Sequence, residues 1–171
     1  MGRRLDYTVT YDAPAPEIYR SFTSRHYWES LLEEYRNLTP QSEITRFSSD
    51  HTGARVVFTH NLPRAYLPPI ARAVMPKDVI ITREQHFEPY DRDRNRAGGT
   101  YGASIPAVVA HFRGSHLLTQ TDQGCQLRLA SVCKVAIPLV GGKLEELVIR
   151  HITELFDAEE KFTTDWVSKH H

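Results

Sequence analysis

The C-terminal stretch from Pro138 to Lys169, PLVGGKLEELVIRHITELFDAEEKFTTDWVSK, decides the fold. After Gly141 and Gly142 it contains no glycine or proline, so nothing in it interrupts a helix. Apolar or ring-bearing side chains recur at intervals of three and four residues, which places them in one stripe along a helix. The stripe comprises Leu144, Leu147, Val148, His151, Leu155, Ala158, Phe162 and Trp166. Charged residues between them, such as Glu145 and Glu159, are expected to face solvent.

A helix of about 25 residues is about 38 Å long, so its apolar stripe needs an equally long apolar surface. The sequence predicts strands that supply it. Residues 3–11 alternate between polar and apolar side chains, and residues 125–137, CQLRLASVCKVAI, form the longest such alternation. Further strands are expected over 42–49, 54–61, 78–89, 100–105 and 107–120. Hairpin-length turns join these strands, so the sheet should be antiparallel, with the short polar strand 42–49 near an edge.

Two short helices are expected after the first strand. The sequence Ala13-Pro14-Ala15-Pro16 ends that strand, and the segments PEIYRSFTS and RHYWESLLEEY each place apolar side chains on one helical face. The pattern as a whole predicts an α+β fold in a single domain spanning residues 1–171. We expect a curved antiparallel sheet of six to seven strands wrapped around the long C-terminal helix.

Two connections stand out between the expected strands. The proline-rich segment 63–76 carries large apolar side chains, including Tyr66 and Leu67, and is expected to form a lid or rim. The charged segment 90–99 ends in two glycines and mixes arginines with acidic residues, so we expect a solvated hairpin tip.

Composition argues against several function classes. The 21 basic and 21 acidic residues cancel, which argues against a nucleic-acid partner. No run approaches the roughly 20 apolar residues of a membrane span, and no apolar segment follows the first arginines as in a secretory signal. A cytoplasmic location without stable membrane insertion is therefore expected. Cys125 and Cys133 would lie about 26 Å apart on one strand, so reduced thiols are expected rather than a disulfide.

The sequence resembles the START-like superfamily, also called SRPBCC, helix-grip or pollen-allergen-like. The resemblance is carried by RRLDYTVTY, by APAPEIYRSFTSRHYW and by the junction CKVAIPLVGGKLEELVIRHITELFDAEEKFTTDWV. More closely, the chain is similar to an uncharacterised branch known mainly from actinobacteria. The resemblance implies a cavity between the sheet and the long helix. Many family members bind lipids, sterols, polyketides or other apolar small molecules, and a minority are cyclases or hydrolases.

We therefore expect an apolar small molecule or lipid to bind between the sheet and the helix. The predicted ligand-binding residues are Phe58, His60, Tyr66, Leu67, Ile81, Tyr101, Val109, His111, Arg113, Leu129, Ser131, Cys133, Leu144, Leu147, Val148, His151 and Leu155. The sequence has no HExxH, GxSxG, CxxC or glycine-rich phosphate loop, so we predict no cofactor, no metal and no catalytic residue.

Three functions stay open at this point. The first is a carrier or sensor of an apolar molecule. The second is an enzyme of the polyketide cyclase or aromatase kind, in which inward-facing His111, Arg113 or Tyr101 would supply acid or base groups. If His111 and Arg113 face water instead, they take no part in the site. The third is a ligand-free interaction module, and the chain is expected to be a monomer or a homodimer.

Overall fold

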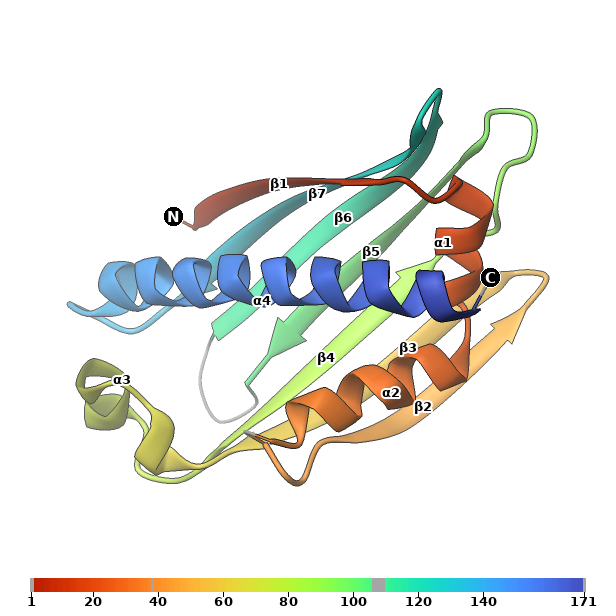
Figure 1. The fold of residues 1–171 in the computed structure, drawn as a ribbon. Helices are drawn as coiled ribbons and strands as arrows, with labels where there is room; N and C mark the ends of the chain where they lie inside the picture. The colour runs from red at the N-terminus through yellow and green to blue at the C-terminus, as the bar shows by residue number, and fades with distance from the viewer. Residues whose placement is uncertain (1, 38, 106–109, 171) are drawn as a thin grey trace.

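In a computed structural model that describes residues 2–37, 39–105 and 110–170, seven strands form one antiparallel sheet around a long helix (Figure 1). The strands are β1 (Arg3–Tyr11), β2 (Glu43–Asp50), β3 (Gly53–Leu62), β4 (Val79–Phe87), β5 (Arg96–Ser104), β6 (Ala110–Thr121) and β7 (Gly124–Val135). The helices are α1 (Ala15–Phe22), α2 (Arg25–Tyr35), α3 (Pro69–Val74) and α4 (Gly141–His170), with a 3₁₀ helix η1 (Arg64–Tyr66). The predicted helix-grip architecture is confirmed.

The order of the strands follows from the antiparallel hairpins and one closing pair. The sheet runs β1-β7-β6-β5-β4-β3-β2, so every neighbouring pair except β1–β7 is consecutive in the chain. β2 lies at one edge, as its short polar sequence predicts. β1 pairs with β7 from Arg3 opposite Cys133 to Tyr11 opposite Cys125, which places the first strand beside the start of α4.

β5 begins at Arg96, four residues before the predicted start, so the prediction of a turn at Gly98-Gly99 was wrong. Both glycines are strand residues, and at Gly99 neighbouring groups occupy the space that a side chain would need. A Cβ on Gly99 would lie 2.1 Å from the carbonyl oxygen of His86 and 2.5 Å from Nε2 of His116. A glycine pair in a charged segment is typical of a turn, and the sequence gives no signal of this close approach.

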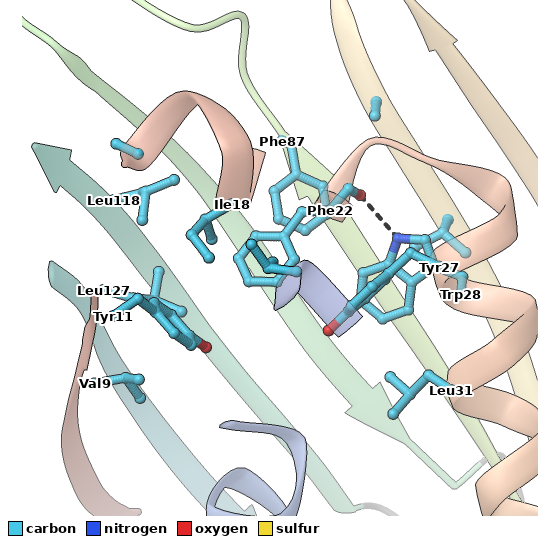
Figure 2. Close-up of a cluster of buried hydrophobic side chains, with 14 of the residues drawn as sticks. Val9, Tyr11, Ile18, Phe22, Tyr27, Trp28, Leu31, Phe87, Leu118 and Leu127 are labelled. Carbon is cyan, nitrogen blue, oxygen red and sulfur yellow. Dashed lines mark hydrogen bonds between the residues drawn. The ribbon is translucent and has the colours of Figure 1, made fainter. Parts of the chain in front are cut away.

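The larger core cluster lies where α1 and α2 pack on the sheet (Figure 2). Ile18, Phe22 and Trp28 are buried there among β-strand side chains such as Phe87. The indole Nε1 of Trp28 donates a hydrogen bond of 2.8 Å to the carbonyl oxygen of Phe22, which satisfies the polar atom of a buried aromatic ring. Val167 near the end of α4 belongs to the same cluster, so this end of the molecule is well packed.

The buried face of α4 differs from the predicted stripe. Leu144 is buried as expected, but His151 and Ala158 are exposed, and Glu145 and Thr163 are buried instead. The helix is rotated relative to the predicted orientation, and groups of the sheet pair with two carboxylates, those of Glu145 and Glu159, that the prediction had placed in solvent. The Glu145 carboxylate accepts a hydrogen bond of 2.9 Å from the backbone N–H of Val135. Buried charges need such partners, and spacing along the helix does not reveal them.

Cys125 and Cys133 are both buried on β7 and are not bridged, as predicted. Burial raises the pKa of each thiol to about 11, so both stay protonated and unreactive at neutral pH. Within the described ranges, no helix combines the length and the apolar character needed to cross a membrane.

Candidate functional site

The concave face of the sheet, which α4 covers, carries polar side chains among apolar ones. On β4 the inward-facing positions follow from the burial of Val79 and Phe87 at its two ends. Arg83 lies on the same face between them, opposite Phe58 of β3. Its side chain is 10% exposed, which is unusual for a charged residue and requires a partner.

That partner is Glu159 of α4. Nη1 of Arg83 lies 3.1 Å from Oε1 of Glu159, and the Tyr35 hydroxyl of α2 donates a hydrogen bond to the same carboxylate oxygen. The guanidinium carbon of Arg83 lies 4.8 Å from the ring centroid of Phe58, which adds a cation–π contact. Burial alone would lower the pKa of Arg83, but the Glu159 carboxylate opposes this and raises the pKa above its ordinary value. The arginine is therefore a permanent internal cation.

His60 of β3 lies beside this ion pair and is held by a hydroxyl relay. Its Nδ1 is 2.7 Å from Oγ of Ser42, and that hydroxyl donates to the carbonyl oxygen of Thr39 at 2.8 Å. The Ser42 hydroxyl also lies 2.6 Å from Oγ1 of Thr39; in the arrangement in which its one hydrogen is donated to Thr39, Nδ1 of His60 carries a hydrogen and Nε2 is an acceptor. Burial and then the charge of Arg83 lower the pKa of His60 to about 4. The imidazole is therefore neutral at neutral pH.

A second polar group lies on the inner faces of β5, β6 and β7. The Tyr101 hydroxyl is hydrogen-bonded to Oγ of Ser131, and its ring lies over Gly114, where a Cβ would come within 2.6 Å of it. Next to it, Nε2 of His116 lies 3.2 Å from the carbonyl oxygen of His86. Nε2 must be the donor, so the buried Nδ1 is an acceptor without a partner. Burial lowers the pKa of His116 to about 4.

The apolar side chains on either side of the Arg83–Glu159 pair are only partly buried. Ile81 and Ala103 lie on the concave face, since Ile81 pairs with His60 and Ala103 with Arg83. Both are half-buried, as are Leu147 and Leu155 of α4. Sheet and helix are therefore less tightly packed here than at the α1–α2 end. Partly open apolar walls with a few fixed polar groups are typical of small-molecule sites.

A surface hollow of about 520 Å³ reaches His60 from the edge of the sheet. Its lining comes from the α2–β2 loop and from β3, and includes Arg36, Ser42, Thr59 and Asn61. A second hollow, of about 480 Å³, lies between α2 and β2. His60 thus lies between the outside of the molecule and the Arg83–Glu159 pair.

The structure places most of the predicted ligand-binding residues on the inside. The buried ones are Phe58, His60, Tyr101, Ser131, Cys133 and Leu144, and the half-buried ones are Leu67, Ile81, Leu129, Leu147, Val148 and Leu155. Leu67 lies on the α3 connection rather than on the concave face. Val109 lies outside the described residues. That these residues bind a ligand stays a prediction.

Four of the predicted positions do not face the interior. His111 and Arg113 flank the buried Phe112 on β6, so the alternation of the strand turns them to the opposite face of the sheet. Arg113 is exposed there. On α4, His151 points to solvent with Glu154 at 3.8 Å. Tyr66 is exposed on the α3 connection. His111 and Arg113 therefore lie on the outer face, which is the alternative in which they take no part in the site.

Sequence reasoning missed the central ion pair and also Tyr35, Ser42 and His116. For Arg83 a weak signal existed. Both faces of β4 mix polar and apolar residues, but the apolar Val79 and Phe87 indicate that the odd-numbered positions, including Arg83, face inward. The sequence contains no signal that Glu159 faces inward, since its partner Arg83 lies 76 residues away in the chain. A glutamate within a charged helical segment is normally a solvated residue.

Comparisons with known proteins agree with this fold. The model of the family described as "Protein of unknown function (DUF2505)" matches residues 6–167. Uncharacterized proteins of Mycobacterium tuberculosis and Mycobacterium bovis are each 27% identical over 173 residues, which covers 98% of this chain and 98% of each relative. These relatives fit the resemblance to an uncharacterised bacterial branch.

Solved structures share the architecture at low sequence identity. The Zhui aromatase/cyclase from Streptomyces sp. R1128 has a TM-score of 0.58 and 16% identity, and the match covers 99% of this chain and 95% of that one. Norcoclaurine synthase from Thalictrum flavum has a TM-score of 0.54 and 13% identity, and the match covers 99% of this chain and 88% of that one. Ara h 8.0201 has a TM-score of 0.57 and 9% identity, and the match covers 99% of each chain. At these identities the likeness concerns the fold alone, and it confirms the helix-grip fold that the resemblance implies.

Proposed function

The chain belongs to this family of proteins of unknown function (DUF2505), and we propose that it is a carrier or sensor of an apolar small molecule. The ligand would lie between the concave face of the sheet and the first half of α4. The proposal includes a cytoplasmic location, which two unbridged buried thiols would suit. We also propose that the chain acts as one folded unit.

One observation carries the proposal: apolar side chains on the concave face of the sheet and on α4, on either side of the Arg83–Glu159 pair, are left half-buried. Ile81 and Ala103 on the sheet, and Leu147 and Leu155 on the helix, keep contact with solvent. Removing such surface from water is the main driving force for binding an apolar molecule. The neighbouring Arg83, Glu159 and Tyr35 would orient a polar group of the ligand, since few fixed polar groups suffice for this.

Fold relatives support a small-molecule ligand without identifying it. An aromatase/cyclase shares the architecture. One structure of norcoclaurine synthase is described as a complex with dopamine and hydroxybenzaldehyde. Because one fold can carry different activities, these relatives support the class of ligand only.

We expect that replacing Ala103 with phenylalanine will prevent binding and leave the fold intact. Ala103 is half-buried on the concave face, and a phenylalanine ring there would occupy the region between β5 and α4 in which the ligand is proposed to lie. The affinity for an apolar fluorescent probe such as N-phenyl-1-naphthylamine should fall at least about tenfold, or about 1.4 kcal/mol. Ser131 is a poorer test position, because Tyr101 and Gly114 already enclose it.

Ala130→Phe is the matched control, because Ala130 is exposed on the other face of β7. Native mass spectrometry of the gently purified wild type should show a co-purified small molecule that the A103F variant lacks. Equal probe affinity in A103F and A130F would exclude this site.

An enzymatic role is the second candidate, and His60 is the observation that favours it. A neutral imidazole whose Nδ1 is fixed by Ser42 offers Nε2 as a proton acceptor beside an internal cation. His60→Gln should then abolish turnover of a bound substrate while the probe affinity stays within about twofold. If H60Q leaves turnover unchanged, His60 is not the base.

A further inference from the structure

We propose that one end of the molecule is a docking surface for an anionic lipid bilayer. This end, here called the tip, consists of residues 63–78, which connect β3 to β4, and residues 134–143, which run from the end of β7 through the connection into the first turn of α4. In an antiparallel sheet with this strand order, β3 and β7 run in the same direction and end at the same side. Figure 1 shows α3 and the start of α4 projecting there, opposite the end packed by α1.

Leu139 is the residue that the fold does not explain. Its side chain is fully exposed, with a relative accessibility of 103%, so it contributes nothing to the core. Its φ of 71° lies in the left-handed region, which strains every residue with a Cβ. A bulky apolar residue at such a position costs folding stability twice, through backbone strain and through exposed apolar surface. Such outliers point to a function at the surface.

Further apolar side chains lie at the tip. Tyr66 of η1 is 62% exposed, and Ile70 and Val74 of α3 are half-buried. Three hydrogen bonds hold this connection in shape. The Arg64 side chain donates to the carbonyl oxygens of Met75 and Arg72, and its backbone N–H donates to Asp78 at 2.9 Å. The apolar residues are therefore presented on an ordered segment, as insertion into an interface requires.

Charge at the tip differs from that of the whole chain, which has 21 basic and 21 acidic residues. The two tip segments carry the basic residues Arg64, Arg72, Lys77, Lys134 and Lys143 against the single acidic residue Asp78. All three lysines are exposed, and none belongs to an ion pair within the described ranges. Exposed lysines on the two segments that carry Leu139 and Tyr66 complement a bilayer whose headgroups are anionic.

Vesicle flotation tests this proposal with the full chain. The wild type should float with phosphatidylcholine vesicles that contain phosphatidylglycerol and not with pure phosphatidylcholine, and added salt should weaken the binding. Leu139→Asp should lower the bound fraction at least about tenfold. Val132→Asp is the matched control, because Val132 is an exposed apolar residue on the outer face of β7.

Two further variants separate lipid binding from folding. Leu139→Gly removes the backbone strain, so it should keep or raise the urea midpoint while vesicle binding falls. The pair K77E/K143E should abolish binding, whereas the control pair K161E/K169E, toward the far end of α4, should not. The proposal is overturned if the wild type does not bind anionic vesicles, or if L139D and V132D bind these vesicles equally.

Discussion

Replacing Glu159 with glutamine is expected to destabilise the protein by about 3–5 kcal/mol. The substitution preserves shape but leaves the Arg83 cation, with a side chain 10% exposed, without its counter-charge. The Phe58 ring and the Tyr35 hydroxyl would remain beside the guanidinium, and neither carries a charge to replace the carboxylate. The cost therefore comes mainly from an unpaired internal charge, rather than from the loss of one hydrogen bond.

Urea unfolding of wild type and variant measures this effect. Glu154→Gln is the matched control on the same helix, because Glu154 is exposed and should change stability by less than about 0.5 kcal/mol. The double variant R83M/E159L should recover much of the loss, since an apolar pair no longer buries a charge. If E159Q is no less stable than E154Q, the ion pair does not hold the sheet and α4 together.

The same ion pair marks where sequence reasoning reached its limit. The long helix, the antiparallel hairpins and the edge position of β2 could be predicted, because each depends on periodicity and turn spacing within one short segment. The burial of Glu159 depends on Arg83 in a distant strand. Spacing on α4 favoured a neighbouring stripe that includes His151, and only the contacts with the sheet set the actual rotation of the helix.

The polar residues of the site were difficult to predict for a related reason. On β6, Phe112, His116 and Leu118 face inward, whereas His111, Arg113 and Leu117 alternate with them. Both sets mix apolar, imidazole and polar groups, so alternation alone does not say which one is internal. Two glycines determine which set is internal, because Gly99 and Gly114 leave room over the inner face of the sheet for the rings of His116 and Tyr101.

Folding stability is expected to fall as the pH drops from about 6.5 to about 4, by roughly 3 kcal/mol for each of two histidines. Burial lowers the pKa of both His60 and His116 to about 4, and the charge of Arg83 adds to the effect on His60. In this pH window the two histidines bind protons in the unfolded chain, where their pKa is about 6.5, but stay neutral in the folded chain. Stability is therefore full above about pH 6.5 and is lost on acidification.

Urea unfolding at about pH 7 and about pH 5 should show this slope, and the variants H60Q and H116Q should each reduce it. His51→Gln is the control, because His51 is exposed in the β2–β3 turn. His116 has a specific reason to resist protonation. Its Nε2–H already faces the carbonyl oxygen of His86, so a second proton would place a buried N–H on Nδ1 with no acceptor. If H116Q and H51Q have the same pH dependence, His116 does not titrate as a buried neutral base.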